Sequence, residues 1–187
     1  LAQELTKKIH TSVVFANPDI NVANQIKKLV STDYYHVFTS TDVIGVEVCA
    51  AIKNIFAMVI GSSKELNTAA SLLQQSINEM IIFTEKLKGK RETVMGLAGV
   101  GDLYVSVKGG RNSQMGEYLG RGMKFGEVKK RKMANITVEG ADLALEIGAK
   151  VKSDFDSNTL PLMISMIDTI LGEKNLKIDW KNFKQIY

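Results

Sequence analysis

The sequence predicts a mainly α-helical protein that begins with a short β-α-β unit. Segments rich in β-branched and aromatic residues, which are typical of strands, occur only in the first 40 residues. After them, apolar residues recur at helical spacing, and no internal repeat is present. The chain has 187 residues, 45% of them hydrophobic, which is enough for one well-buried domain together with a fragment of another.

The opening unit is predicted from two strands and the helix between them. Thr11–Ala16 and Tyr34–Thr39 are the two strand-like segments, and apolar residues recur at helical spacing between them. Asn17 is expected to cap the helix, with Pro18 in its first turn. Because two strands do not make a stable sheet alone, residues 1–40 are expected to be the tail of a larger nucleotide-binding sheet. The missing initial methionine also suggests a fragment.

Residues 41–187 are predicted to form an all-α domain. Ser40-Thr41-Asp42 supplies an N-cap for a helix over Val43–Ile60, which is apolar on nearly all sides and is therefore expected in the middle of a bundle. Further helices are predicted over Asn67–Leu87, Arg91–Leu97, Asn112–Gly120, Thr137–Ile147 and Thr159–Leu171.

The composition indicates which kinds of partner and which cell compartment to expect. The net charge is +4, and the densest basic run, 129–132, has no aromatic residues nearby, so it is interpreted as a solvated face and no nucleic acid is expected. Cys49 is the only cysteine, which excludes an intrachain disulfide and favours a reducing compartment such as the cytoplasm. We expect no apolar run to reach the roughly 20 residues that a membrane span needs. No metal ligands are assigned.

Lys53 lies inside the apolar central helix, followed by Asn54. On spacing alone, the favoured interpretation is a lysine whose stem lies on the helix and whose ammonium reaches water. The alternative is a lysine that lines a polar cleft and gives a proton to a carbonyl oxygen, with Asn54 binding substrate hydroxyls.

Two glycine-rich segments add polar groups. Gly109-Gly110-Arg111-Asn112 precedes a helix, so its arginine and the first-turn N–H groups are suited to a phosphate, although a surface turn would have the same pattern. The segment 96–102 has the wrong glycine order for a nucleotide loop and follows no strand. Its Asp102 is a candidate partner for Lys53 or, alternatively, a helix cap.

Together these segments resemble the NAD(P)-dependent glycerol-3-phosphate dehydrogenases. VIGVEVCAAIKN resembles the family's lysine helix with its G-V-E-x-x-x-A-x-K-N pattern, GLAGVGDL followed by GGRN resembles its G-x-A-G-x-G-D-L and phosphate-binding elements, and TVEG resembles its later V-E-G element. The matches occur in the family's order. The resemblance implies a helical substrate domain like the C-terminal domain of 6-phosphogluconate dehydrogenase, preceded by the end of a Rossmann domain.

The resemblance also implies a role for each matching residue. Lys53 would exchange a proton with the C2 oxygen of the substrate, supported by Asp102. Asn54 and Ser106 would line the substrate, and Arg111 with Asn112 and Gly110 would hold its phosphate. The residues implied to face NAD or NADP are Ala2, Arg111, Thr137 and Glu139. A homodimer in the cytoplasm is implied as well.

Some features depart from the family and leave alternatives open. The family's glycine-rich nucleotide loop is not in this sequence, and 67–71 (NTAAS) lacks an arginine that is often found in the corresponding run. One alternative is a related hydroxy-acid reductase of the same architecture. Another is a non-catalytic helical module that binds a phosphorylated ligand or a partner.

Overall fold

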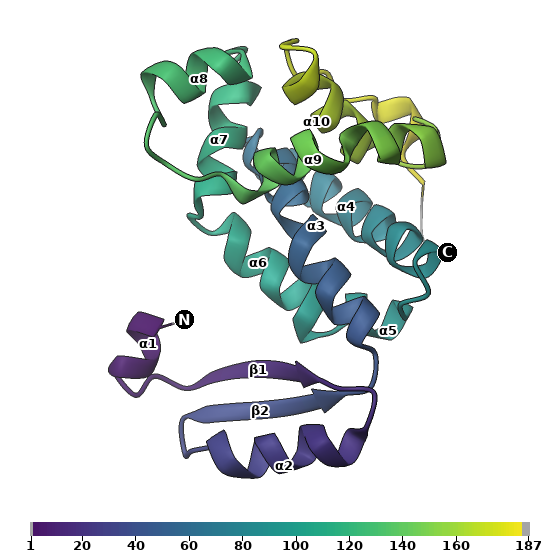
Figure 1. Ribbon diagram of the computed structural model, residues 1–187. Helices are drawn as coiled ribbons and strands as arrows, with labels where there is room; N and C mark the ends of the chain where they lie inside the picture. The colour runs from purple at the N-terminus through teal and green to yellow at the C-terminus, as the bar shows by residue number, and fades with distance from the viewer. Residues whose placement is uncertain (1, 185–187) are drawn as a thin grey trace.

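The computed structural model describes residues 2–184, with side chains from Gln3 onward. A parallel pair of strands lies between helix α2 (Ile20–Val30) on one side and a bundle of helices on the other (Figure 1). The central helix of that bundle, α3 (Val43–Gly61), leaves the sheet directly and runs upward between its neighbours (Figure 1). The mainly α fold class predicted from the sequence is confirmed, and within the described residues both strands lie in the first 40.

The β-α-β unit consists of β1 (Thr11–Ala16), α2 (Ile20–Val30) and β2 (Tyr35–Ser40). The strands are parallel, with Thr11 opposite Tyr35 and Ala16 opposite Ser40. Parallel strands have their carboxyl ends at the same edge of the sheet. The chain therefore enters α3 from that edge, immediately after β2.

The predicted cap of α2 is wrong. Asp19, rather than Asn17, is the N-cap, and the helix begins at Ile20 rather than at Pro18. Asn17 Oδ1 instead accepts the Asp19 N–H at 2.9 Å, which closes a turn around Pro18, and Asp19 Oδ1 accepts the Asn21 N–H at 2.9 Å. Both residues hydrogen-bond the backbone two positions ahead, and sequence alone does not say which of the two turns is followed by the helix.

All the predicted helices are present, with shifted ends. α3 spans Val43–Gly61 with Asp42 as its cap, as predicted, whereas α9 continues seven residues beyond its predicted end to Asp154. Two short helices, α5 and α6, follow α4 and are joined by η1, a single π-helical turn. The remaining elements are α1 (Ala2–Thr6), α4 (Leu66–Lys86), α5 (Arg91–Met95), η1 (Leu97–Gly101), α6 (Asp102–Val107), α7 (Arg111–Gly120), α8 (Phe125–Arg131), α9 (Glu139–Asp154), α10 (Pro161–Leu171) and η2 (Trp180–Asn182). Of these, α1, η1, α6, α8 and η2 were not predicted.

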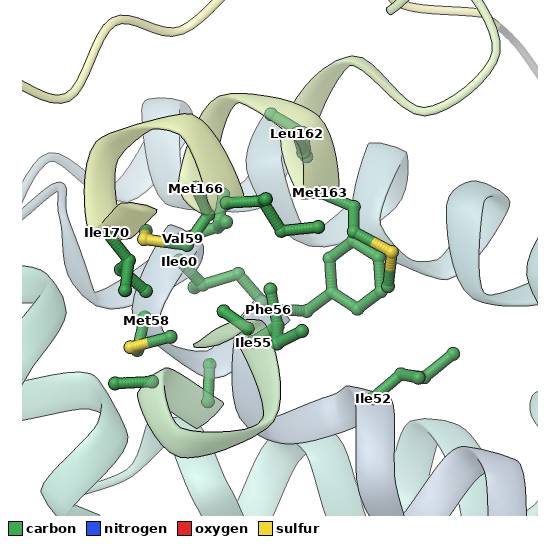
Figure 2. Packing of buried hydrophobic residues seen from close by; sticks show 14 of the residues in the cluster. Ile52, Ile55, Phe56, Met58, Val59, Ile60, Leu162, Met163, Met166 and Ile170 are labelled. Carbon is green, nitrogen blue, oxygen red and sulfur yellow. The ribbon is translucent and has the colours of Figure 1, made fainter. Parts of the chain in front are cut away.

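α3 is the core helix of the bundle. It contacts α4, α5, α6, α7, α9 and α10. Ile55 and Phe56 from α3 pack against Met163 and Met166 from α10, all of them fully buried (Figure 2). Contact on nearly every side explains why this helix has so few polar residues.

The expectation that no apolar run would approach the length of a membrane span is wrong for α3. Its 19 residues have a mean hydropathy of 2.0, which is long and apolar enough to cross a bilayer by length and composition. Half of that window is buried against other helices. The position of α3 in the bundle therefore accounts for its composition.

Glycines let the neighbouring helices approach the backbone of α3. A Cβ on Gly116 of α7 would lie 1.9 Å from the Met58 carbonyl oxygen, and one on Gly140 of α9 would lie 2.5 Å from the Asn54 carbonyl oxygen. Atoms cannot approach so closely, so a larger residue would force the helices apart. The absence of a side chain at these two positions fixes α7 and α9 against α3.

α10 is capped from inside the protein. Glu79 of α4 is fully buried, and its carboxylate accepts the N–H groups of Leu162 and Met163, each at 2.8 Å. Gln75, one turn earlier on α4, donates to the same carboxylate at 3.0 Å and accepts the Lys184 N–H at 2.9 Å. Two side chains on one face of α4 thus hold both the start of α10 and the C-terminal segment.

Candidate active site

Lys53 and Asp102 form an ion pair between α3 and the start of α6. The Lys53 side chain is only 16% exposed, whereas that of Asp102 is 39% exposed, so the pair lies at the edge of the core with one side open. The Asp102 carboxylate contacts the lysine, while the residue in the cap position of α6 is Gly101. Asp102 therefore neutralises a largely buried ammonium, which would otherwise be unfavourable by several kcal/mol.

The glycine-rich segment before Asp102 is a π-helical turn, η1. A Cβ on Gly99 would lie 2.0 Å from the Val94 carbonyl oxygen, so the turn needs a residue without a side chain there. Such turns widen a helix locally and often occur at functional sites. In this protein the turn links α5 to α6 and presents Asp102 to Lys53, and the segment does not have the strand-then-helix context of a nucleotide loop.

The two glycines before α7 are required for different reasons. Gly109 has a φ of +134°, a conformation that side chains strongly disfavour. Gly110 is the N-cap, and a Cβ there would lie 2.6 Å from the Ser106 carbonyl oxygen. No side chain caps α7, and the N–H groups of its first three residues, 111–113, have no acceptor among the described residues. These N–H groups and the helix dipole make the start of α7 suitable for an anion.

Asn112 joins three helices through its side-chain amide. Its Nδ2 donates to Asn54 Oδ1 at 3.0 Å and, more weakly, to Glu139 Oε2 at 3.4 Å, while its Oδ1 accepts the Gly140 N–H at 2.9 Å. Arg111, beside it, pairs with the other oxygen of Glu139. Asn112 is buried but Arg111 is 55% exposed, so the guanidinium remains accessible from solvent.

A cleft separates the sheet from the helices next to the lysine pair. One hollow of about 320 Å³ lies between β1 and α6, where Val14, Ala50 and Val105 form apolar walls beside Asp102. An adjoining hollow of about 470 Å³ shares Val14 and extends to Phe38 of β2. The cleft is thus bounded by both halves of the structure, and Asp102, the partner of Lys53, is one of its lining residues.

Comparison with known proteins assigns this sequence to a family. A sequence profile described as "NAD-dependent glycerol-3-phosphate dehydrogenase C-terminus" matches residues 42–178, well over half of the chain. The chain belongs to this family. The match begins at Asp42, next to the predicted domain boundary at residue 40, and includes the lysine pair and the Asn112 network.

Individual relatives of the glycerol-3-phosphate dehydrogenase family agree. The NADP(+)-dependent glycerol-3-phosphate dehydrogenase of Archaeoglobus fulgidus is 35% identical over 169 residues, covering 82% of this chain and 50% of that protein. The glycerol-3-phosphate dehydrogenase [NAD(P)+] of Clostridium tetani is 37% identical over 145 residues, covering 74% of this chain and 41% of that protein. The chain thus spans about half the length of the curated relatives it matches.

Solved structures of glycerol-3-phosphate dehydrogenases have the same fold. The enzyme from Coxiella burnetii superposes with a TM-score of 0.82 at 26% identity, covering 94% of this chain and 55% of that one. The enzyme from Saccharomyces cerevisiae superposes with a TM-score of 0.79 at 22% identity, covering 91% of this chain and 53% of that one. The second likeness concerns the fold alone.

Most of the residues predicted from the family resemblance gather around α3. Lys53 with Asp102, and Asn54 with Asn112, Arg111 and Glu139, form two clusters that meet on consecutive residues of that helix. Ser106 lies one turn after Asp102 and donates to its carbonyl oxygen at 2.9 Å.

Two of the predicted cofactor residues are not drawn into these clusters. Thr137 is exposed just before α9, without a hydrogen bond from its side chain to any described residue. Ala2 begins α1, and its side chain lies outside the described part of the chain.

Asp42 has contacts that sequence reasoning missed. It was predicted only as a cap of α3, and its Oδ1 does accept the Gly45 N–H at 3.0 Å. Its other oxygen, however, accepts the Lys90 N–H at 2.8 Å and the Thr93 hydroxyl at 2.6 Å. Burial opposes its charge, but the hydrogen bonds from Thr93, Gly45 and Lys90 hold the pKa of Asp42 below its ordinary value. No sequence pattern pairs residues 48 to 51 positions apart, so this link could be found only from the structure.

Proposed function

We propose that this chain is the substrate-binding half of an NAD(P)-dependent glycerol-3-phosphate dehydrogenase. The reaction interconverts dihydroxyacetone phosphate and sn-glycerol 3-phosphate. Membership of the family supports this proposal, and so does one feature of the site. Asp102 lines the cleft and pairs with Lys53, while Asn54, the residue after Lys53, is joined to the anion-binding start of α7. A proton donor on α3 and a phosphate site at the start of the adjoining α7 suit a short phosphorylated ketone.

In the proposed reaction, the guanidinium of Arg111 and the free N–H groups at the start of α7 bind the phosphate and thereby orient the substrate. Lys53 donates a proton to the C2 oxygen as the carbonyl is reduced, and takes it back in the reverse direction. Asp102 keeps the ammonium oriented toward the cleft. Lys53 then offsets negative charge on the oxygen where it develops, in a site partly shielded from water.

The cleft also fits a nicotinamide cofactor. Its apolar walls at Val14, Ala50 and Val105 suit one face of a flat ring, and they lie beside Asp102. When bound, the cofactor supplies or accepts the hydride at C2. Arg111 and Glu139, which the family resemblance implies as cofactor residues, lie at the start of α7 and α9, and Thr137 and Ala2 complete that set by resemblance. The choice between NAD and NADP depends on residues of the nucleotide-binding half.

Three finer features are part of the proposal. Residues 1–40 belong to the nucleotide-binding domain and residues 41–187 form the substrate domain. α3 is a core helix of that domain and does not span a membrane, as its contacts with six other α-helices favour. The enzyme is a cytoplasmic homodimer: a single cysteine favours a reducing compartment, and the family resemblance implies the dimer. Sedimentation of the intact protein and fractionation of cells test the last two points.

The test of the activity is an assay of NADH and NADPH oxidation with dihydroxyacetone phosphate. A protein extended to the full length of the curated relatives should turn over, whereas this chain alone should not, because its sequence contains no G-x-G-x-x-G loop. Faster reduction of an unphosphorylated 2-keto acid by the extended protein would favour the hydroxy-acid reductase. Binding of phosphate without turnover of either substrate would favour the non-catalytic module.

A further inference from the structure

Asp42 lies at the point where the chain leaves β2 and enters α3, and its side chain is almost completely buried, since the residue is 8% exposed. One carboxylate oxygen binds the first turn of α3 through the Gly45 N–H, and the other binds the start of α5 through the Lys90 N–H and the Thr93 hydroxyl. A single carboxylate therefore joins the beginnings of two helices that are far apart in the sequence.

Each of those helices leads to one member of the catalytic pair. α3 carries Lys53 ten residues after its first residue, about 15 Å along the helix axis. α5 ends at Met95, and after the single residue Gly96 the turn η1 leads without a break into α6, whose first residue is Asp102. Because helices transmit a displacement at one end to the other, a shift between the starts of α3 and α5 would move Lys53 relative to Asp102.

The backbones around Asp42 leave no room for a side chain at Gly45 or Gly89. A Cβ on Gly45 would lie 2.0 Å from Asp42 Oδ2, and one on Gly89 would lie 2.8 Å from the Gly45 Cα. The start of α3 thus touches the turn before α5, and the carboxylate fills the remaining space. A charged acceptor that receives three such donors forms stronger hydrogen bonds than a neutral one.

We propose that Asp42 is a positioning residue for the reaction, which sets Lys53 against Asp102 by joining the starts of α3 and α5. It does not touch the substrate. This inference rests on the proposed function for its kinetic consequences, but the position of the pair can be measured without any assay of activity.

The kinetic test uses the protein extended to the full length of its relatives. Asp42→Asn replaces one acceptor oxygen by an amide group that repels the donors, and it should lower kcat about 10- to 100-fold while KM changes less than about threefold. Thr93→Val removes only the hydroxyl donor and should lower kcat in the same direction, whereas Thr93→Ser keeps the donor and should restore it.

The matched control is Asp19→Asn, since the Asp19 carboxylate also caps a helix through one backbone N–H, and its hydrogen bond is to α2 and not to α3 or α5. It should leave kcat unchanged. If Asp42→Asn fails to fold, Thr93→Val carries the test. Equal kcat values for Thr93→Val and the wild type would overturn the inference.

A double-mutant cycle separates positioning from general destabilisation. If Asp42 acts through the Lys53–Asp102 pair, adding Asp42→Asn to Asp102→Asn should lower kcat by less than about twofold, because the pair is already broken. A purely structural effect would multiply with that of Asp102→Asn and would contradict the inference.

The last arm needs no substrate. In the wild type and in Thr93→Val, NMR of the Lys53 side-chain nitrogen and the Asp102 carboxyl carbon reports the contact between them. Signals displaced in Thr93→Val and restored in Thr93→Ser support the inference. Unchanged signals in Thr93→Val overturn the inference even if the extended protein is an active dehydrogenase. Displaced signals in Thr93→Val, together with no activity in the extended wild type, would contradict only the proposed function.

Discussion

Asn112 Nδ2 donates to Asn54 Oδ1 at 3.0 Å and so joins the start of α7 to α3, one residue beyond Lys53. The arginine that is proposed to bind phosphate and the lysine that is proposed to move a proton therefore lie on helices in direct contact. Substitution of each should nevertheless affect a different kinetic constant, because one residue binds a remote group of the substrate and the other acts on the reacting atoms.

Lys53→Ala in the extended protein should lower kcat about 10²- to 10⁴-fold, the usual contribution of a general acid. Stability should change much less than activity, because the Asp102 carboxylate that loses its partner is 39% exposed and can be hydrated. Steady-state kinetics and urea unfolding measure the two effects. Lys64→Ala, which removes an exposed lysine paired with Glu117, is the control and should keep full activity. A near-normal kcat for Lys53→Ala would contradict its assignment as the acid.

Arg111→Lys should raise KM for dihydroxyacetone phosphate about 10- to 100-fold, since a lysine cannot reproduce the two-pronged contact of a guanidinium with phosphate. KM for unphosphorylated dihydroxyacetone should stay the same. Arg121→Lys changes another exposed, paired arginine and should alter neither constant. If both ketones lost affinity equally in Arg111→Lys, the residue would not be a phosphate ligand.

Gly116→Ala should destabilise this chain by about 3 kcal/mol or more, the upper range for overpacking, because the new methyl group would meet the Met58 carbonyl oxygen at 1.9 Å. Urea unfolding followed by circular dichroism measures the loss. Gly96→Ala is the comparison, since its nearest atom would be 3.3 Å away, and it should have a much smaller effect. Equal effects of the two substitutions would mean that α7 can move away from α3 freely.

Glu79 should make stability depend on pH. Burial raises its pKa to about 7, although the N–H groups of Met163 and Leu162 and the Gln75 amide favour the ionised form. Between pH 4.5, the ordinary value, and about 7, the folded protein holds a proton that the unfolded chain has released. The free energy of unfolding should therefore fall as pH rises through this window, by about 3 kcal/mol relative to Glu79→Gln, which cannot ionise.

Urea unfolding of both proteins at several pH values checks this difference. Glu146→Gln, on the exposed face of α9, should keep the pH trend of the wild type. Parallel pH profiles for the wild type and Glu79→Gln would show that Glu79 has the same proton affinity in the folded and unfolded states.

Regular periodicity made most of the fold predictable. The apolar residues of α3 and the β-branched residues of β1 identify their elements because each packs along its whole length. α6 and α8 were not predicted: each is less than two turns long, and their sequences lie next to glycines that indicate loops. The segment before α6 has the glycines of a loop, yet Gly99 is used for close helix contact instead.

For the site, the residues were predictable by their resemblance to a family, whereas their connections were not. Nothing local to Asp42 indicates that it also binds Thr93, and nothing local to Glu79 indicates that a glutamate would be buried as a helix cap. Such contacts depend on which helices are neighbours in space, and that is decided by the packing of the whole bundle.

The glycine contacts of α3 also bear on which substrates the enzyme can evolve to accept. Sliding α3 by one residue would move it about 1.5 Å and bring the Met58 and Asn54 carbonyl groups against residues other than Gly116 and Gly140. The axial position of α3 is therefore fixed by main-chain atoms, and ordinary side-chain changes in the core leave it in place. We expect that adaptation to a longer carbon chain would occur through insertions in the 108–110 loop, and not through gradual movement of the helices.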